Sequence, residues 1–527
     1  MVLKPLNNEG PNSTPMKTQS SLRAAHRVPI SCMFLCNFEV KKGNVLVWAR
    51  YSDGFEKNVN LEDIEFKSMP SGVHEVIDDV INFVIPKGDK EEADGYYNGV
   101  AYFKQNGQEL SEGVNQIDRS RVKMYALGVV VDFDGMQYAR DQDWKADEFS
   151  SANEYVDDLE QLLCQWFNCG TLEEFDIFEQ FFKDNSNGKA VGFPSPVLDR
   201  LTAAAYTGQE LLSSDVPQAK PHMLEYLLYW LRKLGPLLFP LWRSCLLNER
   251  ILILNPPSGS FEKCNALCYC LSMISLFPQA SKICGSKGHY VTPLYTLGVC
   301  DIDRMSKEIS QINSQNRKPN GYIACTSDEI LLSKPELYDK IIRLPSEVED
   351  SYFMDVPKLY DNQEQLIRAT PHDFYSLQIL YKELFGEELS VTEKKNFLKM
   401  VEPLTWSQYI IDGFYWWVTA GYLKPSYYEE PNSIPAGPVG ESELALILRT
   451  LQYFHGRSTV LYQKLKEVFE SKENCGNDET VQLPSADLVA LDLDSFSTQD
   501  HKFIEEIAHK WFNRALQVTG DLYGSAC

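Results

Sequence analysis

Near the start of the chain, in "VPISCMFLCNFEVKKGNVLVWARYS", residues 30–38 are rich in apolar and aromatic side chains and residues 45–51 alternate between apolar and polar positions, with the polar break "KKGN" between them. Gly43 and Asn44 in this break are typical of a tight turn, so the pattern predicts a β-hairpin from residues 30–38 and 45–51. A helical or irregular stretch is expected over "IEFKSMPSGVHEVIDDVINFVI". The segments "YYNGVAYFKQN" and "RSRVKMYALGVVVDFDG" predict two more strands. Residues 28–132 are therefore expected to form a small sheet with a helical crossover.

From residue 146 to residue 184, apolar residues recur every three or four positions, which predicts amphipathic helices. The centre predicts two helices near 222–233 and 236–247, then the strand "RILIL", the helix "FEKCNALCYCLSMISLF" and the strand "TPLYTLGVCDID". After a polar insert, "RMSKEISQINSQNRKPN", the segment "GYIACTSDEILLSKPELYDKIIRLP" predicts a strand, a short helix and a strand. Apolar strands alternating with helices indicate a mostly parallel sheet that is covered on both faces.

From about residue 366 the pattern predicts helices separated by acidic and proline-rich breaks. Ser497 and Asp500 resemble a capping box at the start of the last helix, and Gly520 is the expected C-cap. The whole pattern predicts an α/β protein in four segments. These are a disordered tail (1–27), an N-terminal module (28–206), a central α/β module (207–345) and a helical C-terminal region (346–527).

Two long apolar stretches raise the question of a membrane span, which needs about 18 or more consecutive apolar residues. Charged residues interrupt "PLLFPLWRSCLLNERILIL", and one of them, Arg243, is expected to form a buried ion pair. The stretch from Leu404 to Leu423 is long enough but contains Asp412, so a buried helix is favoured over a transmembrane one.

Composition and charge restrict the function. The formal net charge of -24 argues against nucleic acid as a partner, because phosphate binding needs a basic surface. The 13 cysteines and the polar N-terminus, which lacks a signal peptide, predict reduced thiols and a cytoplasmic location. The tail carries four basic residues against Glu9. It is either a solvated terminus or a weak peripheral contact with anionic lipid on intracellular membranes.

Few residues in the sequence suggest catalysis or ligand binding. "NPPSGSFEK" lacks the second Gly followed by Lys of a phosphate-binding loop, so a strand-to-helix turn is expected. Cys264, Cys268 and Cys270 are interpreted as core residues of a helix rather than zinc ligands, since a fourth ligand and paired spacing are missing. Asp132 and Asp134 end a strand, where a solvated acidic turn is favoured over metal-dependent phosphoryl chemistry.

One basic alternation, "RSRVKM", remains as a candidate site. Arg119, Arg121 and Lys123 would lie on one face of a strand, where they could contact an acidic partner or simply face solvent. No catalytic, cofactor-binding or metal-binding residue is expected elsewhere. The sequence therefore favours a protein that acts through large surfaces.

Three blocks resemble DENN-domain proteins, most closely the LCHN type and its fungal relatives. They are "NFEVKKGNVLVWARY" with "IEFKSMPSGVHEV", "GVAYFKQN" and "RSRVKMYALGVVV"; the central run from "PLLFPLWRSCLLNERILIL" through "GYIACTSDEILLSKPELYDKIIRLP"; and the C-terminal "LTWSQYIIDGFYWWVTAGYL" with "LDLDSFSTQDHKFIEEIAHKWF". Together they cover most of residues 28–520. The resemblance implies a longin-like module over 28–206, a DENN α/β module over 207–345 and an LCHN-type extension over 346–527.

The resemblance also implies an activity, which is guanine nucleotide exchange on a Rab-type small GTPase in vesicle trafficking, with both modules gripping the switch regions. Exchange needs no covalent chemistry and no cofactor, which agrees with the missing motifs. Two alternatives stay open, namely a non-enzymatic trafficking adaptor and a GTPase activator. An activator would use an arginine finger, and the spacing of Arg119 and Arg121 does not single out either for that role.

Overall fold

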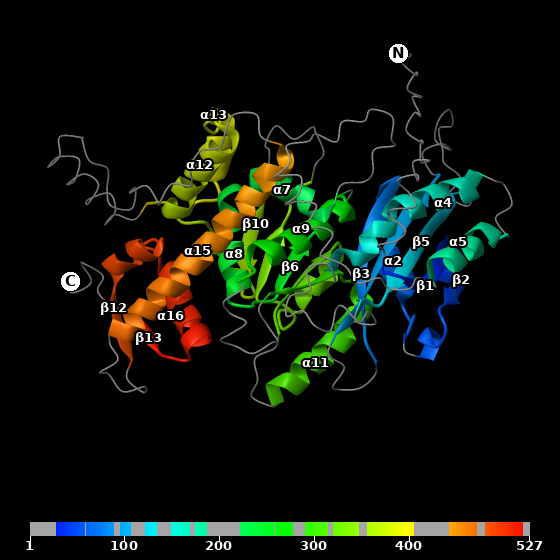
Figure 1. The fold of residues 1–527 in the computed structure, drawn as a ribbon, viewed down its shortest axis with the longest axis horizontal. Helices are drawn as coiled ribbons and strands as arrows, with labels where there is room; N and C mark the ends of the chain where they lie inside the picture. Colours follow the sequence, from blue (N-terminus) through cyan, green and yellow to red (C-terminus); the bar gives the residue numbers. More distant parts are fainter. Residues whose placement is uncertain are drawn as a thin grey trace, which may run out of the picture.

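The computed structural model describes residues 28–57, 59–88, 95–106, 122–133, 149–168, 174–186, 222–257, 259–277, 290–314, 320–346, 356–404, 442–471 and 480–519. Its central feature is an eleven-stranded mixed sheet in the order β11-β10-β9-β6-β8-β7-β3-β4-β5-β1-β2. Along the long axis of the molecule, the N-terminal strands and helices lie at one end, the central module follows, and the C-terminal helices lie at the other end (Figure 1).

The N-terminal strands are antiparallel neighbours. Strand β1 (Ile30–Glu39) and strand β2 (Gly43–Tyr51) form the predicted hairpin, and Gly43 adopts a φ of 81° at the turn. Strand β5 (Met124–Val131) pairs with β1, and strand β4 (Tyr96–Gln105) pairs with β5. The hairpin and both single strands are confirmed.

One strand of this part was wrongly predicted. The stretch expected to be helical or irregular contains the short helix α2 (Ile64–Ser68) and a 3-10 turn (Val73–Glu75), but it ends in strand β3 (Asp78–Pro86). Seven consecutive residues of β3 are buried, because helices cover both faces of the sheet here. A short apolar run buried on both faces has no strand-like alternation, so its pattern cannot distinguish strand from helix.

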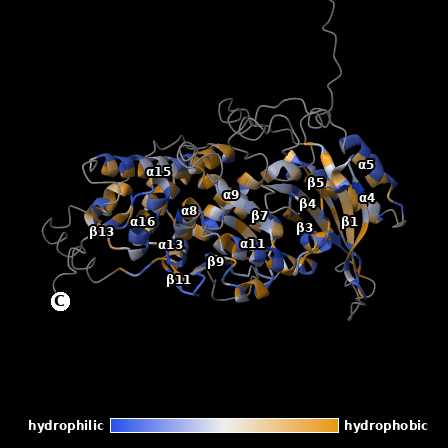
Figure 2. Ribbon diagram, turned by 90° about the horizontal axis from the view of Figure 1, so that it is seen from below, coloured by the Kyte–Doolittle hydropathy of each residue, from blue (hydrophilic) through white to orange (hydrophobic). Residues whose placement is uncertain are grey.

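Two predicted amphipathic helices pack on one face of the N-terminal strands. They are α4 (Val156–Asn168) and α5 (Asp176–Ser186). Trp48 of β2 lies 5.8 Å from the ring of Phe178 on α5, in a core of aromatic and aliphatic side chains. In the hydropathy view, strand β1 is largely hydrophobic while α5 shows both colours, as expected of a helix with one solvated face (Figure 2).

The central module contains α7 (Leu227–Leu234), α8 (Leu238–Leu246), β6 (Ile251–Leu254), α9 (Phe261–Ile274), β7 (Thr292–Thr296), β8 (Tyr322–Thr326) and β9 (Lys340–Arg343). Strands β7, β8, β6 and β9 are mutually parallel. The other ladders of the sheet are antiparallel, so the mostly parallel sheet that was predicted is limited to these four strands. The segment interpreted as a polar insert between elements is itself largely helical, since helix α11 (Ile302–Ser314) covers most of it.

The C-terminal region is helical, as predicted, but it also contributes strands. Its helices are α12 (Pro371–Phe385), α13 (Val391–Leu398), α15 (Glu443–Ser471) and α16 (Thr498–Phe512). Strands β10 (Lys358–Asp361) and β11 (Leu366–Ile367) extend the main sheet, and β12 (Val481–Pro484) pairs in parallel with β13 (Leu516–Thr519).

The last helix starts at the predicted Ser497, but the predicted capping box and C-cap were wrong. Ser497 stands at the N-cap of α16 without a side-chain capping bond, and Asn513, with a φ of 51°, ends the helix. Gly520, like nearly all of the expected helix Leu404–Leu423, lies outside the described residues. Among the helices described, none combines the length and the apolar character that crossing a bilayer requires.

Candidate functional site

The N-terminal strands and the central module meet where β3 pairs with β7. Phe83 of β3 lies opposite Tyr295 of β7, which is buried and has a φ of 59°. A positive φ is strained for a bulky residue and persists only where the surroundings hold it in place. The Tyr295 hydroxyl donates a hydrogen bond to the carbonyl of Phe149, which helps to hold it. We call this junction the module seam.

A carboxylate on β3 caps a helix of the central module across the seam. Asp79 is buried, and its Oδ2 accepts a hydrogen bond of 2.6 Å from the backbone N–H of Phe261, the first residue of α9. Its Oδ1 accepts from the N–H of Glu262 at 3.1 Å. Burial raises the pKa of Asp79 to about 6, although these N–H donors act in the opposite direction. The predicted strand-to-helix turn in "NPPSGSFEK" is confirmed, and the N–H groups at the start of α9 bind this carboxylate.

A second buried contact joins the seam from the other side. Lys67 of α2 donates to Asp301 at 2.7 Å, and both side chains are nearly inaccessible to solvent. Asp301 also accepts from Arg304 at 3.1 Å and from the N–H of Gly298 at 3.2 Å. Burial opposes the charged form of Asp301, but Lys67 and these further donors hold its pKa below the ordinary value.

Replacing Lys67 by Met is expected to lower the free energy of unfolding by about 1–3 kcal/mol at neutral pH, because Asp301 stays buried with only Arg304 as a cation. The wild-type contribution is present above the unfolded-state pKa of Asp301 and is lost as the pH falls through its lowered native value. Urea titrations at several pH values should therefore show the deficit shrinking toward acid pH. A deficit that does not change with pH would contradict this role.

Four large apolar side chains are exposed beside the seam. Their exposed fractions are 46% for Phe66, 43% for Ile77, 50% for Val299 and 54% for Ile330. They belong to α2, to the residue just before β3 and to the segments that follow β7 and β8. Ser327 donates a hydrogen bond to the carbonyl of Ser71, which brings the end of β8 against the segment after α2. We call these four residues the seam surface.

The segments that carry the seam surface also carry acidic residues. Exposed or half-exposed carboxylates within a few positions of its residues in the sequence are Glu62, Asp63, Glu75, Asp78, Asp303, Asp328 and Glu329. Asp328 accepts from the N–H of Val299 at 3.2 Å, which holds this apolar residue at the end of β7. The one lysine on α2, Lys67, is occupied by Asp301. The surface therefore fits a partner with an apolar centre and a basic rim.

The predicted basic site is described only in part. Lys123 is exposed just before β5, and its backbone N–H donates to Asn106 Oδ1 at 2.8 Å. Arg119 and Arg121 lie outside the described residues. The strand register places Lys123 at the same end of the sheet as Asp78, because Asp78 pairs with Lys104 and Met124 pairs with Gln105.

The other candidates from the sequence have structural roles. Cys264, Cys268 and Cys270 are buried on α9, as predicted. Asp132 accepts from Lys87 at 2.8 Å, and Asp134 lies outside the described residues.

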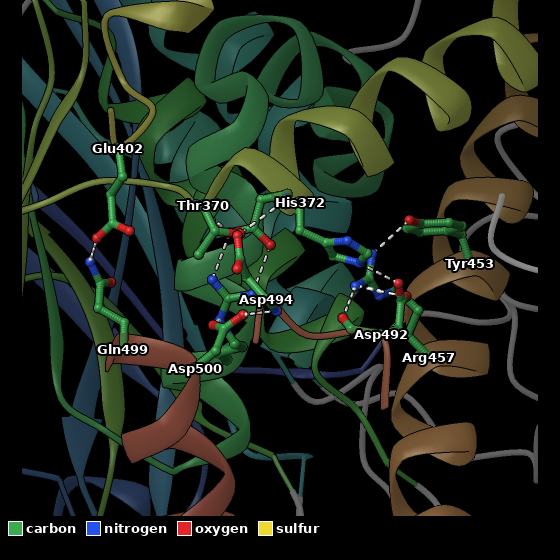
Figure 3. A network of polar contacts seen from close by, with 11 residues as sticks. Thr370, His372, Glu402, Tyr453, Arg457, Asp492, Asp494, Gln499 and Asp500 are labelled. Atoms are coloured by element: carbon green, nitrogen blue, oxygen red, sulfur yellow. Dashed lines mark hydrogen bonds and ion pairs between the residues drawn. The ribbon is translucent and has the colours of Figure 1, made fainter. Parts of the chain in front are cut away.

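A buried charged cluster connects the central module to the C-terminal helices (Figure 3). Arg243 of α8 makes a bidentate pair with Asp373 of α12, with N–O distances of 2.8 and 2.7 Å. The Nε of Arg243 lies 3.4 Å from Asp500 of α16. The ion pair predicted for Arg243 is thus present and has two carboxylate partners. Burial raises the pKa of Asp500 to about 6, against the opposing effect of Arg243.

The cluster continues along α15 (Figure 3). Arg457 pairs with Asp492 at 2.7 Å, and the ring of His372 lies 2.6 Å from the same carboxylate. Burial disfavours the charged form of His372, but Asp492 outweighs this and raises its pKa. Because these groups are largely shielded from solvent and form ion pairs with one another, we interpret the cluster as a structural joint.

A mixed sheet with helices packed against it defines an α/β protein, and four large apolar side chains are exposed at its module seam. Residues 33–352, more than half of the chain, match the family profile of DENN domain-containing protein 11. The chain therefore belongs to this DENN-domain family. Residues 440–524 match a separate domain of unknown function.

Individual relatives agree with this assignment. "Uncharacterized protein ANR2" of Saccharomyces cerevisiae is 37% identical over 518 residues, which cover 94% of both chains. DENN domain-containing protein 11 of Danio rerio is 26% identical over 317 residues, 59% of this chain and 53% of that protein. The counterpart in Xenopus laevis is 24% identical over 311 residues, 59% of this chain and 58% of that protein. The similarity to ANR2 therefore includes the C-terminal region.

The sequence did not reveal the buried contacts that hold the seam together. Asp79 stood in a stretch interpreted as helical or irregular, and Lys67 and Asp301 are 234 positions apart. A lysine inside an otherwise apolar segment is a weak signal of a buried partner. The sequence offered no way to identify that partner.

Proposed function

We propose that this protein is a guanine nucleotide exchange factor for a Rab-type small GTPase and that the seam surface contacts the GTPase. DENN-domain proteins generally act as exchange factors for Rab GTPases in membrane trafficking. The observation that carries the proposal is the group of exposed apolar residues where the N-terminal strands and the central module meet. A GTPase gripped by both modules would lie across this seam.

Exchange can proceed through such a surface without reactive side chains. An exchange factor binds the nucleotide-free GTPase more tightly than the nucleotide-bound form, and by reciprocity it weakens nucleotide binding by the same factor. A surface with equal affinity for both forms would not shift the equilibrium. The acidic rim would speed encounter with a partner that presents basic groups, and raised salt would reduce this effect.

The test is a panel of purified Rab GTPases loaded with a fluorescent guanine nucleotide and mixed with the full-length protein. Accelerated release from one or a few members, together with tight binding to the nucleotide-free form, is the expected result. Binding without acceleration would favour the adaptor, and faster hydrolysis would favour the activator. If no member is bound or accelerated, the proposal is wrong.

Replacing Val299 and Ile330 by Asp is expected to reduce exchange at least about tenfold, because central apolar residues of an interface commonly contribute 1–2 kcal/mol or more each. Both side chains are half exposed, so folding should be retained, as checked by circular dichroism. Val391 on α13 is 86% exposed and far along the chain, so Val391→Asp is the matched control. If Val391→Asp loses as much exchange activity as the Val299 and Ile330 variant, the GTPase does not bind at the seam surface.

A further inference from the structure

The tip of the β1–β2 hairpin has a composition opposite to that of the protein as a whole. Phe38 is 40% exposed and Val40 is 65% exposed, and both Lys41 and Lys42 are exposed beside them. The acidic residue at the tip, Glu39, is paired with Lys42 at 3.0 Å. A chain with a net charge of -24 thus presents apolar side chains and lysines at one turn.

A third lysine lies beside the tip. An open hollow of about 290 Å³ separates the turn from the residues that begin β5, and both Lys41 and Lys123 line it. The apolar side chains along it include Phe38, Val40 and Met124. The lysine ammonium is a flexible point charge that suits a phosphate group without requiring a fixed bidentate geometry.

The size of this feature favours a lipid surface over a protein partner. A stable protein interface needs about 800 Å² from each side, which a single turn with two exposed apolar side chains cannot supply. Contact with a bilayer needs only a few apolar side chains at the acyl boundary and nearby cations for anionic headgroups.

We propose that this hairpin tip, with Lys123, is a contact site for anionic phospholipid bilayers. Val40 and Phe38 would enter the headgroup region while the three lysines face lipid phosphates and carboxylates. The strand register places the tip at the same end of the sheet as the seam surface, because Asn37 of β1 pairs with Tyr125 of β5 and Tyr125 pairs with Lys104 of β4. Lipid contact at the tip does not depend on the GTPase partner.

The test is sedimentation of the full-length protein with vesicles of phosphatidylcholine alone or mixed with phosphatidylserine at about 4:1. Binding is expected only with phosphatidylserine and should weaken as salt is raised. Each lysine near the surface contributes about fivefold, so Lys41→Ala with Lys42→Ala should reduce partitioning about 25-fold. Val40→Asp should also reduce it strongly.

The matched control is Lys464→Ala with Lys466→Ala on α15. It also removes two exposed lysines, one of them paired with an acid, since Lys466 lies 3.4 Å from Glu470. This control should bind vesicles as the wild type does. Equal loss in control and tip variants, unchanged binding of the tip variants, or equal binding to neutral vesicles would each overturn the proposal. Exchange measured without vesicles should be unchanged in the tip variants, which separates this test from that of the proposed function.

Discussion

Leu252→Asp is expected to abolish cooperative folding of the central module. Leu252 is 1% exposed in β6, and its backbone pairs with Ala324 of β8 on one side and Ile341 of β9 on the other. A carboxylate here would have no cation or water to replace the lost solvation, so the cost is at least about 5 kcal/mol. That cost is comparable with the whole stability of a typical domain.

Circular dichroism and limited proteolysis of the purified variant would measure this loss. Leu252→Met keeps a similar apolar volume and is the matched control, with an expected cost below about 1.5 kcal/mol. A soluble Leu252→Asp protein that unfolds cooperatively at the wild-type urea concentration would show that β6 is not buried at the centre of the sheet.

Arg243→Met is expected to lower the free energy of unfolding by about 3–5 kcal/mol, because it leaves Asp373 and Asp500 buried without their shared cation. Both carboxylate side chains are fully buried. The two acids are expected to take up protons in the variant, so the loss should be smaller at acid pH than at pH 7.

The comparison for this variant is Lys466→Met, which removes the cation of an exposed pair with Glu470. Exposed pairs contribute at most about 1 kcal/mol, so this control should be nearly neutral in the same urea titration. If Arg243→Met is equally neutral, the cluster does not hold the C-terminal helices on the central module.

The sequence alone determined the elements that have a local cause. The β1–β2 hairpin was predicted from an apolar run and an alternating run on either side of Gly43, because a turn that requires a positive φ favours glycine. Helix α4 was predicted because its apolar residues recur every three or four positions. Arg243 was expected to form a buried ion pair because a charge within an apolar segment cannot remain alone. The family was also identifiable from the order of these blocks.

Only the tertiary structure decided where distant residues meet. Strand β3 lacks alternation because helices pack against it, and one of them, α9, comes from a segment far along the chain. Ser497 and Asp500 have the spacing of a capping box, yet Asp500 turns instead toward Arg243 and the N–H of Asp494. A buried cation offers a carboxylate more stabilisation than a helix end can.

The same reason applies to the candidate site. The sequence suggested Lys123 as a candidate because other basic residues lie close to it in the chain. It did not suggest the seam surface, whose members Phe66 and Ile330 are 264 positions apart. Exposure of an apolar residue depends on what packs over it, and no local pattern encodes that. The sequence thus determined most of the elements, while the packing of β3 against β7 decided which apolar residues are exposed at the seam.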